Sequence, residues 1–188
     1  MPEIAATEST HSVQFYEDES ELLPHLVKYV GTALRLGHDA IVIGRPKLVE
    51  QLSMELHREH VQRSPFGTRR GQLTTLDAQA TLDKFMVDGW PDPDLFDKHV
   101  APLVQRATVG GKTAVAYGEM VALLCERGQY AAAIKLEKIW NGLLERLKFS
   151  LLCAYPMRLF SNMTGRANYQ SICNAHSHVI GAAQPSEA

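Results

Sequence analysis

The chain has 188 residues, of which 45% are hydrophobic and 21% charged, and its formal net charge at pH 7 is −2. This hydrophobic content is sufficient for one buried core, and the length favours a single domain. The sequence lacks the basic runs that contacts with a phosphate backbone require, which argues against nucleic-acid binding. It also lacks an apolar stretch of the roughly 20 residues that a membrane span needs, so we expect no membrane association and a cytoplasmic protein.

The ends of the chain differ from the rest in composition. Residues 1–10 are small, polar and acidic, with neither a basic start nor an apolar block, so we expect a disordered tail rather than a signal peptide. We expect a second tail at 181–188 and one domain at 11–180.

The cysteines and histidines give little sign of a metal site. Cys125, Cys153 and Cys173 are widely separated and form no CxxC pair, which favours buried thiols over a disulfide framework or a zinc site. His57 and His60 lie one helical turn apart, but no third ligand accompanies them, so a solvated helix face is the better interpretation. We therefore expect no metal and no cofactor.

Strand-like and amphipathic segments alternate along the chain. We expect strands at 11–16, 40–43, 72–76, 113–117 and 149–155. We expect helices at 22–36, 47–60, 94–108, 121–125, 130–147, 158–160 and 167–179, and one that Asp77 caps and that runs to 87. Turn residues predict loops at 61–71, 88–93 and 161–165. Within the helix at 130–147, Glu137 is assigned to the polar side. His176 and His178 are assigned to the terminal helix, without the flanking pattern of a kinase phosphoacceptor.

This alternation predicts an α/β fold in which helices cover both faces of a mostly parallel sheet. We expect a three-layer α/β/α sandwich with five strands.

Open sheets of this kind place ligands at the carboxyl ends of their strands. The candidate binding residues follow or close three of the expected strands, and they are Tyr16, Glu17, Asp18, Glu119, Met120 and Tyr155. Together they would form one rim, aromatic on one side and acidic on the other, suited to a small ligand with an apolar body and a donor or cationic group.

Structural interpretations of the same residues stay open. Phe15 and Tyr16 also fit a core, and 17–21 also fits a solvated helix start. Glu119 is suited to three roles: accepting backbone N–H groups at the start of its own helix, binding a ligand, or acting as a catalytic base. His11 is interpreted as a hydrogen-bonded structural histidine.

Seven short segments, taken in order and spacing, resemble one sensory family. They are 11–18, 37–43, 76–78, 117–120, 136–141, 151–155 and 172–176. Over about residues 12–179 the chain resembles the MEDS (methanogen/methylotroph, DcmR-type) sensory domain. The resemblance implies a stand-alone module that senses small organic compounds such as hydrocarbon derivatives. Because no output domain is attached, its signal would leave through a partner such as a histidine kinase or a regulatory ATPase.

The MEDS family also resembles the RecA/KaiC-type ATPases, which implies a related fold. A phosphate loop requires G-x-x-x-x-G-K-[ST] between a strand and a helix. Gly111, Lys112 and Thr113 supply the last three letters, but Arg106 stands where the first glycine belongs, and the triplet enters a strand. We therefore expect no Walker A loop.

The functional hypothesis is a non-enzymatic cytoplasmic module that binds a small ligand and passes its state to a partner by protein–protein contact. Two alternatives stay open: a ligand-free interaction module and a degenerate nucleotide-binding, ATPase-like protein. The sequence also leaves open whether the chain forms a homodimer.

Overall fold

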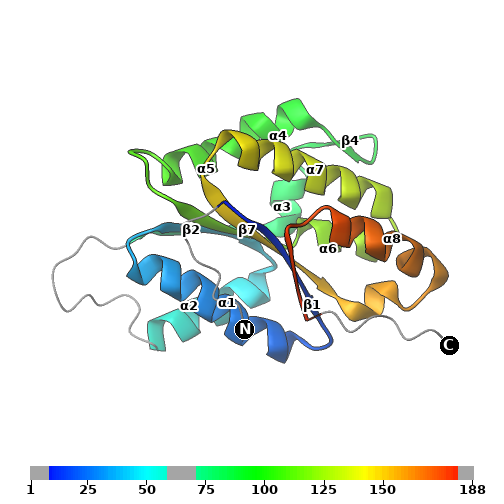
Figure 1. Cartoon of the computed structure of the whole chain (residues 1–188), viewed down its shortest axis with the longest axis horizontal. Coiled ribbons are helices and arrows are strands. Elements are labelled where there is room, and N and C mark those ends of the chain that lie inside the picture. The colour runs from blue at the N-terminus through cyan, green and yellow to red at the C-terminus, as the bar shows by residue number, and fades with distance from the viewer. Residues whose placement is uncertain (1–8, 59–70, 182–188) are drawn as a thin grey trace.

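The computed structural model describes residues 9–58 and 71–181 (Figure 1). Nearly all of the two expected tails, most of the expected loop at 61–71, and His60 lie outside the described residues. In the first half of the chain the elements are β1 (His11–Tyr16), α1 (Glu19–Arg35), β2 (Asp39–Gly44), α2 (Pro46–Arg58), β3 (Leu73–Asp77), α3 (Ala78–Leu82), β4 (Met86–Val87) and β5 (Trp90–Pro91). They continue with α4 (Pro93–His99), α5 (Ala101–Ala107), β6 (Ala114–Gly118), α6 (Met120–Glu126), α7 (Tyr130–Arg146), β7 (Phe149–Pro156), η1 (Met157–Phe160), α8 (Met163–Asn174) and β8 (His178–Ile180).

Six strands of the described residues form one sheet in the order β3-β2-β6-β7-β1-β8, and every neighbouring pair is parallel. Helices α1 and α2 cover one face, and α3 to α8 cover the other, so the molecule has three layers (Figure 1). The predicted α/β/α sandwich is confirmed, with six strands where the sequence predicted five.

Strand side chains alternate between two cores, because successive residues of a strand point to opposite faces of a sheet. In β1, Val13 and Phe15 face the core under α3 to α8, whereas Tyr16 faces the core under α1 and α2. In β7, Tyr155 belongs to the first of these cores and Ala154 to the second. This alternation decides which candidate site residues can meet.

The prediction of a helix up to residue 87 is wrong. Helix α3 begins at the Asp77 cap, whose carboxylate accepts the Ala80 N–H at 2.6 Å, but it ends at Leu82. The chain then forms the β4–β5 hairpin around Asp88 and Gly89, which have φ angles of 49° and 81°. An Asp-Gly pair with two positive φ angles is the usual two-residue hairpin turn, and the sequence prediction treated it as a loop.

The expected helix at 94–108 is divided in two. Helix α4 ends at His99, and α5 follows after Val100 with proline in its first turn. Because Pro102 has no backbone N–H, it cannot continue the hydrogen bonding of α4.

The C-terminal prediction is also wrong in part. Helix α8 begins earlier than expected, because the Asn162 side chain accepts the Gly165 N–H at 2.8 Å and caps the helix. It ends at Asn174, and residues 178–180 form β8 beside β1. His176 therefore lies in the turn between α8 and β8, and His178 lies in a strand.

Candidate functional site

The chain leaves two neighbouring strands in opposite directions. From β2 it runs through α2 to β3, and from β6 it runs through α6 and α7 to β7, on the other side and over the other face of the sheet. Such a divergence opens a crevice at the carboxyl ends of the two strands, which is where open α/β sheets bind ligands. We call the four residues gathered there, Tyr16, Arg45, Tyr117 and Glu119, the strand-end site.

Glu119 follows β6 and is 3% exposed. Its Oε2 accepts the backbone N–H of Arg45 at 2.6 Å, and its own N–H donates to Ile43 O at 3.0 Å. A Cβ on Gly44 would lie 3.1 Å from the same Oε2, so glycine leaves room for this approach. The Glu119 side chain accepts no hydrogen bond from the start of its own helix, the structural role that the sequence allowed. It instead joins the ends of β2 and β6.

Burial raises the pKa of the Glu119 carboxyl, and the N–H and charge of Arg45 only partly offset this. Two tyrosines share the environment. Burial raises the pKa of Tyr16 to about 12, and the Glu119 charge adds to the rise. The pKa of Tyr117 is also raised, first by burial and then by Glu119 and Tyr16. The Tyr117 hydroxyl is buried and has no hydrogen-bond partner among the described residues.

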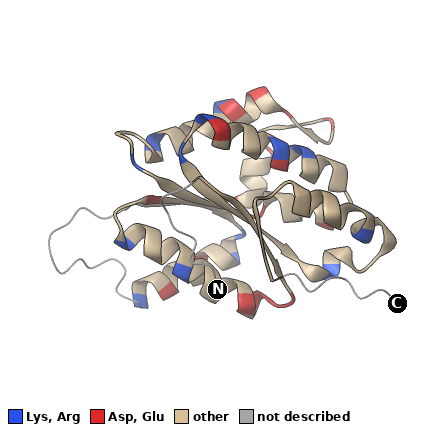
Figure 2. Cartoon of the chain, in the orientation of Figure 1, with Lys and Arg blue, Asp and Glu red and all other residues tan. Residues whose placement is uncertain are grey.

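Ion pairs extend from the strand-end site to the surface. Arg45 Nη2 lies 2.8 Å from Glu126 Oε2, and Arg158 Nη2 lies 2.8 Å from Glu126 Oε1, so one carboxylate links α6 both to the residue after β2 and to η1. Acidic residues also gather at the start of α1 (Figure 2). Beside Gly44, an open hollow of about 310 Å³ lies between the ends of β2 and β3. Its lining residues are Gly44, Pro46, Val49, Glu50, Thr75, Leu76 and Asp77.

The structure divides the six residues of the predicted rim. Tyr16 and Glu119 come together at the strand-end site. Asp18 is exposed and caps α1 by accepting the Ser20 N–H at 2.8 Å, and Glu17 is exposed beside it. Met120 and Tyr155 are fully buried in the core on the other face. Because Tyr155 is in register with Phe15, it points to the face opposite Tyr16, so the six side chains do not form a single rim.

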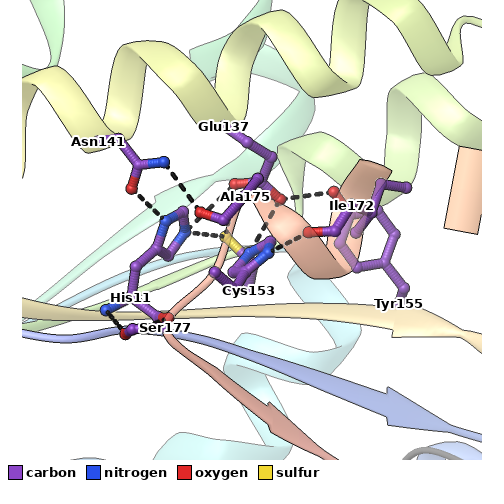
Figure 3. A network of polar contacts seen from close by, with 9 residues as sticks. His11, Glu137, Asn141, Cys153, Tyr155, Ile172, Ala175 and Ser177 are labelled. Atoms are coloured by element: carbon purple, nitrogen blue, oxygen red, sulfur yellow. Dashed lines mark hydrogen bonds and ion pairs between the residues drawn. The ribbon is translucent and has the colours of Figure 1, made fainter. Parts of the chain in front are cut away.

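A second polar group lies inside that other core (Figure 3). We call its members, His11, Glu137, Cys153 and His176, the buried cluster; they come from β1, α7, β7 and the α8–β8 turn. Glu137 is 0% exposed, and its Oε2 lies 3.3 Å from both His11 Nε2 and Cys153 Sγ. His11 Nε2 lies 3.4 Å from Cys153 Sγ. The other carboxylate oxygen, Oε1, lies 3.3 Å from His176 Nε2 and accepts the Tyr155 hydroxyl at 2.6 Å.

Charges in the buried cluster depend on one another. Burial by itself would raise the pKa of Glu137, but the His176 charge and the neighbouring His11 ring more than offset this and hold it well below its usual range. Glu137 in turn raises the pKa of His176 despite the opposing effect of burial. The pKa of the Cys153 thiol is raised by burial and by the Glu137 charge. The carboxylate is therefore the ionised centre of the cluster.

Sequence reasoning did not identify the buried cluster as a group. It treated His11, Cys153 and His176 separately, and it assigned Glu137 to the polar side of its helix, which is wrong. Glu137 lies four residues after Ala133 and three before Trp140, both of which are buried. That spacing places the carboxylate within the buried stripe of α7 and was the available signal.

The Gly111-Lys112-Thr113 triplet lies in the turn that leads from α5 into β6. This is the amino-terminal end of a strand, as the sequence predicted, and not the start of a helix. None of the described helices is long and apolar enough to cross a membrane.

Comparison with known families agrees with the segments singled out in the sequence. A family model described as "MEthanogen/methylotroph, DcmR Sensory domain" matches residues 10–173, which include most of the sheet and all four residues of the strand-end site. No curated protein matches the chain. The chain belongs to the MEDS family of sensory domains.

Proposed function

We propose that this sensory domain binds a small organic ligand at the strand-end site and passes its state to a partner regulator, such as a histidine kinase or a regulatory ATPase, in the cytoplasm and without catalysis. Membership of a sensory family supports the general role. The ligand, its site and the partner are our inference from the arrangement of residues around Glu119.

The observation that carries this proposal is a buried carboxylate beside an unpartnered hydroxyl where the paths of two strands diverge. Only Oε2 of Glu119 has a hydrogen bond among the described residues, which leaves Oε1 available to a ligand. Burying the Tyr117 hydroxyl without a partner costs free energy. A ligand that donates to Glu119 and bonds with Tyr117 would remove that cost.

The chemistry of the site indicates the class of ligand. An acidic acceptor with two aromatic hydroxyls suits a small molecule that has an N–H or O–H donor, or a cationic group, on an apolar body. The adjoining hollow of about 310 Å³ is at the small end of ligand pockets. A ligand of few carbon atoms is favoured over a nucleotide, since the site offers no phosphate loop.

The ion pairs suggest how a partner protein would detect ligand binding at the strand-end site. Arg45 contributes its backbone N–H to Glu119 and its guanidinium to Glu126, which also pairs with Arg158 of η1. A change at the Glu119 carboxylate would therefore alter the charge balance of a partly exposed ion-pair network. We propose that a partner recognises this network.

Thermal unfolding of the full chain against a panel of small alcohols, amines and amides, and against nucleotides with magnesium, tests the proposal. At about 100 times its dissociation constant, a ligand adds about 2.7 kcal/mol to the free energy of unfolding and raises Tm by several degrees. We expect such a shift with an organic compound and its loss in Tyr117→Phe and Glu119→Gln.

Tyr29→Phe is the matched control. Tyr29 donates to Ser150 O at 3.0 Å, at the opposite end of the sheet. Its variant should be less stable but should keep the ligand-induced shift. Three outcomes would each contradict the proposal: a Tm shift only with nucleotide, no Tm shift with any compound, or an unchanged Tm shift in both site variants.

A further inference from the structure

The ligand atoms of the buried cluster have the spacing of a metal coordination shell. His11 Nε2, Glu137 Oε2 and Cys153 Sγ form a triangle with sides of 3.3, 3.3 and 3.4 Å. In a tetrahedral zinc site, bond lengths of about 2.0 to 2.3 Å place neighbouring ligand atoms roughly 3.3 to 3.8 Å apart. His176 Nε2 supplies a fourth position, and one ligand atom from each of the four residues lies within 4.8 Å of the others.

Both histidine rings are held with the same nitrogen facing inward. Asn141 Nδ2 donates to Ala175 O at 2.9 Å, so its Oδ1 faces His11 Nδ1 at 2.7 Å and accepts the ring proton (Figure 3). His176 Nδ1 lies 2.7 Å from Ile172 O and donates to it. In each neutral ring the Nε2 lone pair therefore points towards Glu137. Metal-binding histidines are oriented in the same way, by a hydrogen bond from the other ring nitrogen.

This orientation calls for a positive charge at the centre. When both rings are neutral, two imidazole lone pairs converge on one carboxylate, and His176 Nε2 is buried without a regular hydrogen bond, although it lies 3.3 Å from Glu137 Oε1. A proton on one ring can satisfy only that ring. A metal ion would satisfy both nitrogens, the carboxylate and the Cys153 sulfur together.

We propose that His11, Glu137, Cys153 and His176 bind one divalent transition-metal ion of the zinc class. Two nitrogens, one oxygen and one sulfur suit zinc, cobalt or ferrous iron, whereas magnesium and calcium prefer oxygen ligands. Because the protein supplies all four ligands and the side chains are buried, the site is of the closed, structural kind.

The proposed ion would join the first described strand to the turn that precedes the last one. Three ligands come from β1, α7 and β7, whereas His176 comes from the turn before β8, the three-residue strand at the edge of the sheet. Release of that short strand from β1 would give an ion a route to the cluster. Binding would then fix the α8–β8 segment to the core, on the face of the sheet opposite the Tyr16 and Tyr117 side chains.

The test is a titration of the full chain, stripped of metal by a chelator, with Co²⁺ as a visible probe and Zn²⁺ as competitor. We expect one equivalent of Co²⁺ to produce tetrahedral cobalt bands with a thiolate charge-transfer band, which Zn²⁺ removes. One equivalent of Zn²⁺ should also raise Tm. Cys153→Ala should abolish the charge-transfer band. His176→Gln removes a direct ligand, so it should weaken Co²⁺ binding by more than the about 10- to 100-fold that loss of a residue which only orients a ligand costs.

Cys125→Ala and Cys173→Ala are the matched controls, because both remove thiols that lie outside the cluster. Each should keep the charge-transfer band. If Cys153→Ala does not fold, the proposal is tested with His176→Gln and the two control variants, because residue 176 lies in a turn. Absence of cobalt bands in the unmodified chain, or a charge-transfer band that depends on Cys125 or Cys173, would overturn the proposal.

Discussion

Glu119 and Glu137 are both buried carboxylates, yet their pKa values move in opposite directions. Glu119 has one short hydrogen bond from a backbone N–H, which does not offset the cost of burying its charge. Glu137 accepts a tyrosine hydroxyl and lies between two histidine rings, and the charges and hydrogen bonds of those rings more than offset that cost. Burial alone therefore does not determine the protonation of an acid, because the partners that accompany it decide the outcome.

The pKa of Glu119 leads to a prediction for stability. The native protein keeps the Glu119 proton to higher pH than the unfolded chain does. The stability that this proton contributes is therefore complete below the pKa of Glu119 in the unfolded chain and is lost as pH rises through its pKa in the folded protein. The glutamine side chain in the Glu119→Gln variant cannot ionise. In urea unfolding from about pH 4 to about pH 8, the free energy of unfolding should fall less in Glu119→Gln than in the unmodified protein.

Glu145→Gln, which removes an exposed carboxylate from α7, is the control for the change in net charge. Parallel stability curves for Glu119→Gln and the unmodified protein would show that the Glu119 proton is not linked to folding.

Sequence reasoning at the scale of residues succeeded where a side chain follows a strand end and failed where partners come from distant segments. The strand that precedes Glu119 places it near Tyr16, and this was predictable. The contact of Glu119 with Arg45 depends on β2 lying beside β6, and the buried cluster depends on four separate elements meeting. No local pattern contains that information, although the spacing of Glu137 in its helix was a usable sign.

Among the elements, α8 is held in place by a close approach of two backbones. A Cβ on Gly165 would lie 2.0 Å from Leu159 O and 2.8 Å from Phe160 Cα. Because these are backbone atoms, the helix would have to move away from η1. The segment also supplies Tyr169, which packs against Phe15 and Phe160 with ring centroids 4.8 and 5.3 Å apart.

We therefore expect Gly165→Ala to destabilise the protein by at least about 1 to 3 kcal/mol, as overpacking does. Gly142→Ala in α7 is the matched control, because a Cβ there would meet no atom within 4 Å. It should stabilise by about 0.5 to 1 kcal/mol through helix propensity alone. Thermal or urea unfolding measures both changes, and equal effects of the two substitutions would contradict the close packing of α8.

The elements that were predicted well carry a strong periodic pattern over many residues. Helices α1, α2 and α7 and the apolar strands β2, β6 and β7 were found close to their observed bounds. Strand β8 has only three residues, none of them buried, and it forms because β1 offers a free edge. That edge is created by residues far away in the chain, so a helix was the better local prediction.

For the whole molecule, the pKa values of the tyrosines show how completely the layers exclude water. The chain has six, and burial is the first cause of a raised pKa at each of them. The folded pKa values lie above those of the unfolded chain, so stability is lost as pH rises above about 10. We expect tyrosinate absorbance to rise in one cooperative step that coincides with loss of helical circular dichroism. Gradual titration near pH 10 in a chain that keeps its helices would contradict this.

The order of the strands also decides when the sheet can be completed during synthesis. Strand β1 is made first, but its two neighbours in the sheet are β7 and β8, and the backbone N–H of His11 bonds to a side chain 166 residues later. At about 5 to 20 residues per second, a ribosome needs roughly 10 to 30 s to supply that partner. Meanwhile β2 and β3 can already pair, whereas the apolar side chains of β1 stay exposed on the nascent chain. Chaperones that act at the ribosome should therefore engage the first strand of this protein until the last one emerges.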